Sequence, residues 1–292
     1  MGLSIGAVVP NFDYAHFLPD RLASIGAQRR PLSMLVFLDD ASRDASWAAA
    51  QPLLDGFPCP VQRHRNPVNS GSVLGQWRDG VARLDTDLVW LAEADDRADP
   101  GLTEALAARL EAEPEAILAF CDSAAIGTDG IRMADDSQGY YTAFGDDPLA
   151  GDLSMPAGEF LARCLCPRNL MVSASAVLWR REVLAAALAA VEGEDWLCAG
   201  DWRVYAEACS AAADARIAFA GTPLSEHRRH DGSVTGRTPR ARHLGEVVAM
   251  HALLRRRLGA APQREEAMRR HLDDLRHAWQ LVRAGMGGQA GG

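Results

Sequence analysis

The sequence predicts an α/β fold in which helices flank both faces of a mainly parallel sheet. The first observation behind this prediction is a regular alternation of short apolar runs and amphipathic helical patterns over the first 120 residues. The second is that the runs 34–38 and 88–92 are continuously apolar, as is typical of strands buried on both faces. The third is a set of helix-start signals between the runs, such as Asp99-Pro100, where Asp caps a helix and Pro suits its first turn.

The expected elements follow in order through the first half of the chain. Strands are expected at 5–9, 32–38, 61–64, 88–92 and 117–120. Helices are expected over 16–27, from Ser42 onward, over 70–84 and from Asp99 onward. Leu18, Leu22 and Ile25 lie near one face of the first helix, which is the face that should pack on the sheet.

The second half is less regular at its start. Residues 121–157 are rich in Gly, Asp and Ser, and we expect a hairpin followed by a mobile loop over the site. The later elements are a helix, a strand and a helix within 158–191, a helix at 201–209, strands at 217–220 and 223–227, and two helices after Pro239 that 259–262 separate. Residues 285–292 are expected to be disordered.

Composition narrows the function. The chain has 292 residues, and a hydrophobic content of 48% with a charged content of 24% is ordinary for a soluble globular protein. The net charge of −9 argues against a nucleic-acid partner. All 30 basic residues are Arg, which excludes chemistry that needs Lys. Arg residues gather in the last 56 residues, so the predicted C-terminal helices are locally basic.

The cysteine spacing and the lack of export signals indicate the cellular compartment. The six Cys residues lack paired zinc-site spacing, so we expect free thiols in a reducing compartment. Residues 1–4 lack the basic start of a signal peptide, and no apolar stretch is long enough to cross a bilayer. The expected location is the cytoplasm, with peripheral contact at the inner membrane face as the furthest membrane role.

Two apolar runs end in adjacent carboxylates. Asp39 and Asp40 follow one run, and Asp95 and Asp96 follow shortly after another. Ligands of open α/β sheets bind beyond the carboxyl ends of the strands. Carboxylates there suit a hard cation such as Mg²⁺ or Mn²⁺, which shares its oxygen ligands with phosphates. The two pairs therefore predict one site for a metal-bound nucleotide.

Several short segments occur in an order that resembles a family 2 glycosyltransferase of the GT-A fold, whose core is a Rossmann-like sheet. They are Val8-Val-Pro-Asn11, Leu38-Asp-Asp-Ala-Ser42, Arg65-Asn66 with Asn69-Ser-Gly71, Glu93-Ala-Asp-Asp96, Gly200-Asp-Trp-Arg-Val-Tyr205 and His227-Arg-Arg-His-Asp-Gly-Ser-Val-Thr235. The resemblance implies a GT-A domain over 1–236, with a nucleotide-binding half at 1–120 and an acceptor-side half at 121–236. A helical extension at 237–285 and a disordered tail at 286–292 complete the expected organisation.

The resemblance also implies roles at the donor end of the site. Asp39 would read the nucleobase, beside backbone contributed by Pro10 and Asn11. A simpler role for Asp39 is a cap or an Asx-turn at the strand end, and Asp40 has a mainly structural role as its alternative. The amides around Asn69 and Gly71, which lead into a helix, favour an anion; the alternative is that Ser70 only caps that helix.

Metal and proton-transfer roles follow in the same way. Asp96 would bind the metal directly, with Asp95 near the ribose or the metal. His230 would complete the metal shell, and Arg228 would contact the diphosphate. Asp201 is the candidate general base, which removes the proton of the acceptor hydroxyl. Glu194 and Asp195 are its rivals, because relatives often carry Glu-Asp where this chain has Gly200-Asp201.

The function that the resemblance implies is transfer of a sugar, with inversion, from a UDP, dTDP or GDP donor to a hydroxyl of a glycan or polysaccharide, with Mn²⁺ or Mg²⁺. Two alternatives stay open: a nucleotidyltransferase, and a non-catalytic glycan-binding or assembly module. The C-terminal helices would dock on the catalytic domain, on a second copy in a homodimer, on a larger transferase partner or on anionic lipid.

Overall fold

The computed structural model describes residues 2–143 and 147–280. Its strands are β1 Ile5–Asn11, β2 Met34–Asp39, β3 Val61–Arg65, β4 Leu88–Leu91, β5 Arg97–Ala98, β6 Ala116–Ile126, β7 Arg132–Ala134, β8 Leu153–Pro156, β9 Val177–Arg180 and β10 Arg216–Arg228. Its α-helices are α1 Leu18–Gly26, α2 Ser46–Asp55, α3 Val73–Ala82, α4 Leu102–Ala112, α5 Gln138–Tyr141, α6 Ala157–Arg163, α7 Arg181–Ala190, α8 Gly200–Ala211, α9 Val234–Arg237, α10 Arg240–Leu258 and α11 Pro262–Ala278, with one short 3-10 turn at Ala174–Ala176. The predicted disordered tail lies outside the described residues.

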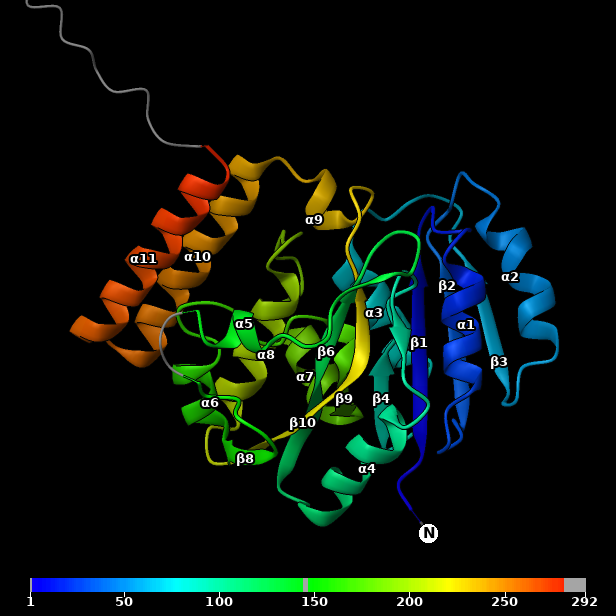
Figure 1. Cartoon of the computed structure of the whole chain (residues 1–292). Helices are drawn as coiled ribbons and strands as arrows, with labels where there is room; N and C mark the ends of the chain where they lie inside the picture. Colours follow the sequence, from blue (N-terminus) through cyan, green and yellow to red (C-terminus); the bar gives the residue numbers. More distant parts are fainter. Residues whose placement is uncertain (1, 144–146, 281–292) are drawn as a thin grey trace, which may run out of the picture.

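One mixed sheet forms the centre of the molecule (Figure 1). Its strand order is β3-β2-β1-β4-β9-β6-β10-β5, with β7 added beside β6 and β8 beside β10. Strands β3, β2, β1 and β4 are parallel, as the alternating pattern predicts. Strand β9 runs antiparallel between β4 and β6. The α/β fold class is confirmed, and β9 separates the four parallel strands from the parallel pair β6 and β10.

Helices cover both faces of this sheet. Alternate residues of β1 show the division, because Val8 packs in one buried cluster while Ala7 and Val9 pack in another. Helices α1, α2 and α4 contribute to the Ala7 cluster. Helices α3, α6, α7 and α8 contribute to the Val8 cluster. The predicted three-layer arrangement therefore rests on two separate apolar cores.

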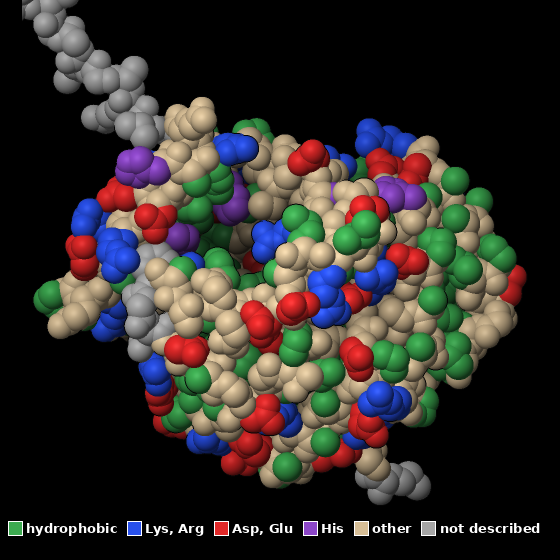
Figure 2. Space-filling model, viewed as in Figure 1, with side chains coloured by type: hydrophobic (Ala, Val, Ile, Leu, Met, Phe, Trp, Pro, Cys, Tyr) green, Lys and Arg blue, Asp and Glu red, His purple; other side chains and the backbone are tan. Residues whose placement is uncertain are grey.

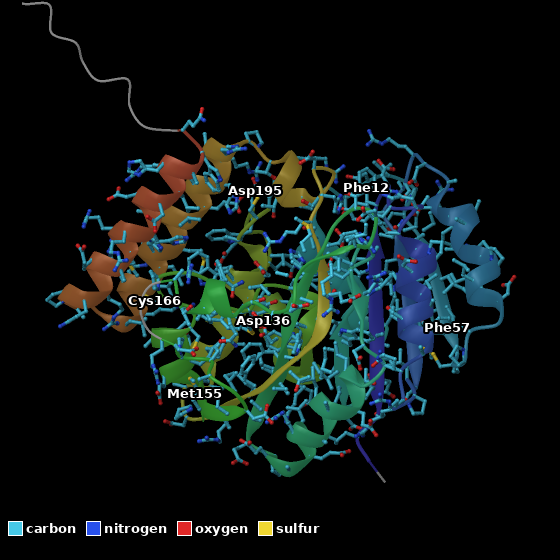
Figure 3. The ribbon with its side chains drawn as sticks, viewed as in Figure 1. Phe12, Phe57, Asp136, Met155, Cys166 and Asp195 are labelled. Carbon is cyan, nitrogen blue, oxygen red and sulfur yellow. The ribbon has the colours of Figure 1, made fainter. Side chains whose placement is uncertain are left out.

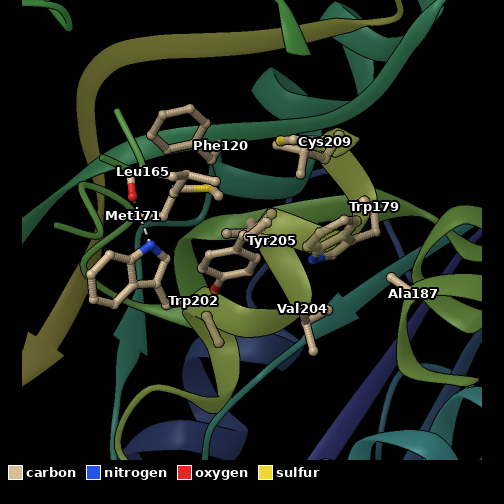
Figure 4. Packing of buried hydrophobic residues seen from close by; sticks show 14 of the residues in the cluster. Phe120, Leu165, Met171, Trp179, Ala187, Trp202, Val204, Tyr205 and Cys209 are labelled. Carbon is tan, nitrogen blue, oxygen red and sulfur yellow. Dashed lines mark hydrogen bonds between the residues drawn. The ribbon is translucent and has the colours of Figure 1, made fainter. Parts of the chain in front are cut away.

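The C-terminal helices share one of these cores. Met250 and Leu254 of α10 and Met268 of α11 are fully buried in the Val8 cluster. Figure 4 shows the centre of that cluster, where Trp202 of α8 donates its indole N–H to the Leu165 carbonyl at 2.9 Å. Burial on this scale shows that α10 and α11 pack against the sheet-bearing part of the chain. The domain boundaries remain a prediction.

Some elements differ from their predicted form. The two late strands are one strand, β10, whose pairing with β6 shifts between Ala220 and Pro223. Pro223 has no N–H to give to a ladder, so a bulge there interrupts the pattern without ending the strand. The predicted hairpin after residue 121 is present as β6 and β7, but β8 falls where only a loop was expected. In the described part of the chain, no helix has both the length and the apolar character to cross a membrane.

Candidate active site

The carboxyl ends of the strands meet at one edge of the sheet. Strands β1, β2 and β4 are parallel, and β6 and β10 run the same way because β9 is antiparallel to both β4 and β6. The segments after β2, β4 and β10 therefore come together, although they lie far apart in sequence. Figure 3 shows Phe12, which follows β1, and Asp195, which precedes α8, at the same end of the molecule.

Asp39 lies at the end of β2 and is buried. The side-chain amide of Asn11 donates to its Oδ1 at 2.9 Å, and the Arg65 Nε lies 3.0 Å from its Oδ2. The backbone N–H of Ser42 donates to the same Oδ2 at 3.2 Å. Pro10 pairs with Leu38 in the sheet, one residue before the Asn11–Asp39 pair. Asp39 therefore holds the ends of β1 and β2 and the start of the following loop together.

Asp40 binds the loop that leads to α3. It accepts hydrogen bonds from the side chain of Asn66 at 2.6 Å, from the N–H and hydroxyl of Ser70 at 2.9 and 2.8 Å, and from the side chain of Gln76 at 3.2 Å. Asn69 donates to the Asp40 carbonyl at 3.0 Å. These bonds give Asp40 a structural role.

The helix after this loop begins later than predicted. Helix α3 starts at Val73, and Ser72 is its N-cap, accepting from the Gly75 N–H at 3.0 Å. Ser70 instead bonds to Asp40, so it does not cap the helix. Gly71 has a φ of +66°, a conformation that favours glycine, and it turns the chain into the helix.

Asp96 is buried beneath the edge of the sheet, with 2% of the residue exposed. Its Oδ2 accepts from the Ser173 hydroxyl at 2.8 Å, and its Oδ1 accepts from the Arg228 N–H at 2.9 Å and lies 3.3 Å from His227 Nδ1. Burial acts to raise the pKa of Asp96, but the nearby charges of His227 and Arg21 outweigh it and leave the pKa well below its usual range. Asp96 is thus an ionised anchor for the segment after β10.

Asp95 has fewer partners than Asp96. Its Oδ2 lies 3.0 Å from His230 Nε2, and its side chain is 15% exposed. The His230 ring packs edge-on against Tyr14 and Phe17, which fixes its orientation. A carboxylate oxygen and an imidazole nitrogen thus lie together at the edge of the sheet, and both are ligand types for a divalent cation.

Arg228 is buried and bound to the backbone. Its guanidinium donates to the carbonyls of Asp95 at 2.6 Å, Gly127 at 2.9 Å and Thr128 at 3.1 Å, and it lies over the Phe17 ring. These bonds tie β10 to the loops after β4 and β6. Its neighbour Arg229 is exposed and lines the adjoining cavity.

Asp201 lies in the first turn of α8, facing the same edge. Its Oδ2 accepts from the Asn169 side chain at 3.1 Å, and its Oδ1 accepts from the Trp202 N–H at 2.6 Å. Burial raises the pKa of the Asp201 carboxyl to about 6, and the charge of His227 opposes that rise. A carboxylate with such a pKa accepts a proton more readily than an ordinary Asp.

The rivals of Asp201 are engaged elsewhere. Glu194 forms a two-bond pair with Arg203, with both distances 2.9 Å. The Asp195 side chain is 86% exposed and pairs with Arg242 at 2.9 Å. Both acids therefore support the loop before α8, and Asp201 is the least exposed of the three candidates.

A cavity of about 360 Å³ adjoins these groups. His227, Arg229 and Tyr140 line it, together with polar residues of the segment that follows β7. Figure 2 shows a hollow on this face beside the C-terminal helices, with His and Arg side chains at its rim. A larger hollow of about 530 Å³ beside α4 is lined by different residues.

Four residues near the site carry no predicted role. Ser173 and Asn169 lie in a segment without a motif, so no signal marks them, although they bind Asp96 and Asp201. His227 stands within the quoted late motif. Glu93 stands two residues before Asp95; it accepts from the Trp77 indole at 2.7 Å, and burial together with the charge of Asp95 raises its pKa to about 8.

Comparison with known proteins decides the family. The model described as "Glycosyl transferase family 2" matches residues 7–187, which is more than half of the chain. The chain belongs to glycosyl transferase family 2. It is therefore a glycosyltransferase, and the resemblance seen in the sequence motifs is confirmed. A search of curated proteins finds no match.

Solved structures confirm the GT-A fold of this family 2 chain. The S. aureus TarS 1-349 structure in complex with UDP-GlcNAc has a TM-score of 0.69 at 12% identity, over 97% of this chain and 77% of that one. The mannosyltransferase PcManGT from Pyrobaculum calidifontis, in complex with GDP-Man and Mn2+, has a TM-score of 0.61 at 15% identity, over 94% of this chain and 69% of that one. At such identities the likeness concerns the fold alone.

Proposed function

We propose that this glycosyltransferase moves a sugar, with inversion and with a divalent cation, from a nucleoside diphosphate to a hydroxyl of a glycan. The observation that carries the proposal is that Asp95 lies beside His230 at the carboxyl edge of the sheet, and that Asp201 interacts electrostatically with His227, which pairs with Asp96 there. Complexes of structural relatives with UDP-GlcNAc and with GDP-Man support a nucleotide-sugar donor. Family membership argues against a nucleotidyltransferase.

Asp95 and His230 fit a cation whose remaining ligands the phosphates of the donor would supply. Within residues 2–143 and 147–280, no group of three or more His, Cys, Asp or Glu side chains is arranged to hold a metal. Mg²⁺ and Mn²⁺ bound with phosphates need only one or two protein carboxylates, so Asp95 with His230 is sufficient. The bound ion would neutralise charge on the departing diphosphate. Mn2+ in the PcManGT complex supports this choice.

This proposal revises the division of roles between the two Asp residues. Asp96 accepts from Ser173 and from the Arg228 N–H and pairs with His227, so three partners already hold its two oxygens, whereas His230 is the one partner seen at the Asp95 carboxylate among the described residues. We assign metal binding to Asp95 and a supporting role to Asp96. Arg228 likewise supports the site through backbone carbonyls, and Arg229 is the proposed contact for anionic parts of a substrate.

Asp201 is the proposed base. Asn169 orients one oxygen of its carboxylate, and a pKa of about 6 leaves the group mostly ionised at neutral pH but able to accept a proton. Attack by the deprotonating acceptor hydroxyl on the anomeric carbon, opposite the departing diphosphate, inverts that carbon. One carboxylate is enough for this single displacement.

The nucleotide end is proposed around Pro10, Asn11 and Asp39, with the loop of Asn69 and Gly71 beside it. A carboxylate has about four lone-pair sites, and three donors already bind Asp39. We propose that the fourth lone pair of Asp39 accepts from the imide N–H of a nucleobase, and that the adjacent backbone contacts the same edge of the base. The Arg-rich outer faces of α10 and α11 support at most peripheral contact with an anionic surface.

The test is donor binding measured by thermal unfolding, with UDP, GDP, dTDP and CDP sugars, each with and without Mn²⁺. We expect a rise in Tm with one nucleotide class that requires the ion and is lost in Asp95→Asn. Asp55→Asn is the matched control, because Asp55 is exposed on α2 and pairs with Arg63. A flat response of the folded wild type across the panel would refute the nucleotide-sugar proposal, and a rise without Mn²⁺ would refute metal dependence.

A further inference from the structure

Helix α10 reaches the start of the helix that carries Asp201. Both oxygens of Glu246 accept from the N–H of Leu197, at 3.1 and 3.2 Å. Its Oε2 also accepts from the N–H groups of Cys198 and Ala199, at 2.8 and 2.9 Å. Glu246 is 7% exposed. A carboxylate from the C-terminal extension thus binds three successive amides, 47 to 49 residues earlier in the chain.

These amides lie where α8 lacks a cap of its own. Ala199 is the N-cap residue of α8, and an Ala side chain has no oxygen to accept from the first turn. A carboxylate at a helix N-terminus is favoured by charge-assisted hydrogen bonds and by the helix dipole. Because three consecutive N–H groups converge on one carboxylate, the backbone direction into α8 is fixed. Asp201 follows Ala199 by two residues.

Helix α10 also holds α8 further along. Arg257 donates to the Ala206 carbonyl at 2.8 Å and to the Ser210 hydroxyl at 2.7 Å, and it pairs with Glu207. The contacts advance along both helices in the same direction, so α10 lies alongside α8 from its start to its last turn. Glu246 therefore lies on a helix that is bound to α8 at two places.

We propose that Glu246 is a positioning residue that holds Asp201 in place for proton transfer. The inference rests on the proposed role of Asp201 as the base. It makes α10 part of the catalytic machinery and not only a docking element. Asp201 makes its own side-chain bonds to Asn169 and Trp202, and Glu246 sets where the backbone that carries it begins.

The principal test compares Glu246→Gln with the wild type. A Gln side chain keeps one acceptor oxygen, but it loses the charge and places an NH₂ group where Oε1 accepts from Leu197, so the bonds to the three amides weaken. We expect kcat to fall about 10²-fold, the loss that a displacement near 1 Å produces, while the KM for the donor and the affinity for Mn²⁺ stay unchanged. Amide exchange at Leu197, Cys198 and Ala199 should accelerate, which is a readout independent of activity.

Glu265→Gln is the matched control. Glu265 lies on α11, carries the same charge and pairs with Arg255, and its bonds do not involve residues 197–199. Its kcat and its exchange at those amides should match the wild type. Glu246→Asp is the second variant, in case Glu246→Gln does not fold: the charge remains but the reach is one methylene shorter, so kcat should fall by a smaller factor.

Combination with Asp201→Asn separates the two proposals. If Glu246 acts through Asp201, Glu246→Gln costs no further activity in the Asp201→Asn background. Inactive Asp201→Asn together with wild-type kcat in folded Glu246 variants would overturn the positioning role and leave the base proposal standing. Full activity in Asp201→Asn would instead overturn the base, and the positioning role with it.

Discussion

The ends of β2 and β4 start from the same sequence signal and differ in their surroundings. Each strand is a buried apolar run, and a pair of adjacent Asp residues follows each one. At β2, both Asp39 and Asp40 are buried and hold several donors from nearby loops. At β4, Asp96 likewise holds several partners, but within the described part of the chain the Asp95 side chain faces only His230, and it stays partly exposed.

The difference teaches that the donors around a carboxylate decide its chemistry. A carboxylate whose lone pairs are filled by N–H and O–H groups holds loops together. One that keeps free lone pairs, as Asp95 does, can take a cation and a phosphate-bearing ligand. Asn66, Ser70 and Gln76 supply the donors at Asp40 from the next loop and helix. Among the described residues, no donor other than His230 lies at the Asp95 carboxylate.

Loss of the Asp95 carboxylate should have the largest effect. In Asp95→Asn we expect kcat/KM to fall about 10³-fold, because the variant removes the charge that binds the cation and so weakens stabilisation of the departing diphosphate. Chelation of the metal in the wild type should reproduce the loss. Sugar transfer and Mn²⁺ affinity by calorimetry are the measurements.

The proposed difference between the ends of β2 and β4 is wrong if Asp40→Asn loses as much Mn²⁺ affinity as Asp95→Asn. Equal losses would mean that the two strand ends form one cation site, whatever donors surround Asp40. Retained Mn²⁺ affinity in Asp95→Asn would contradict the assignment of Asp95 itself.

Asp40→Ala should act on stability instead. The change leaves four donor groups of Asn66, Ser70 and Gln76 without their acceptor in a buried place, which costs about 3 kcal/mol in the free energy of unfolding. Urea unfolding measures this, and the Mn²⁺ affinity of the folded variant should be unchanged. A change below about 0.5 kcal/mol would show that water replaces the carboxylate without loss.

Much of the fold is predictable from the sequence because it rests on local patterns. The parallel strands β1 to β4 and their helices follow from apolar runs and turns, whereas the helices begin a few residues later than the predicted caps. The position of β9 between β4 and β6 is not local, since strand order depends on packing across the whole sheet. Likewise, the bulge at Pro223 depends on the pairing of β10 with β6, which the local sequence does not specify.

The sequence predicts the acidic residues of the site, but it does not predict the residues that bind them. Asp95, Asp96 and Asp201 stand in recognisable segments, whereas Ser173, which binds Asp96, and Asn169, which binds Asp201, stand in a segment without a motif. Glu246 is one of many charged residues on a basic helix, and only the folded chain brings it to α8. Which of two adjacent acids keeps free lone pairs is therefore a tertiary property.

The pH dependence of sugar transfer should show that Asp201, like Asp95, takes part in the reaction as an ionised carboxylate. Burial raises the pKa of Asp201 to about 6, and the base works only when ionised. We expect kcat to be constant above about pH 7 and to fall about tenfold for each pH unit below 6. The measurement is a profile of kcat from pH 4.5 to 8.5 with saturating substrates.

The Asp201→Asn variant provides the control for this limb. Its residual activity should no longer change near pH 6. A limb near pH 6 that persists in Asp201→Asn would belong to another group and would contradict the assignment of Asp201 as the base.

The smallest effect is expected where one donor of a buried carboxylate is itself exposed to solvent. Arg65 pairs with Asp39 at 3.0 Å, but the Arg65 side chain is 45% exposed, so water screens the pair. Arg65→Gln should lower the free energy of unfolding by about 0.5 kcal/mol and should raise the donor KM by a few-fold, because Asn11 and Ser42 still hold Asp39. A loss as large as that of Asp40→Ala would mean that Arg65, and not the buried donors, orders the end of β2. The number of donors around a carboxylate would then not decide its role at the end of β2.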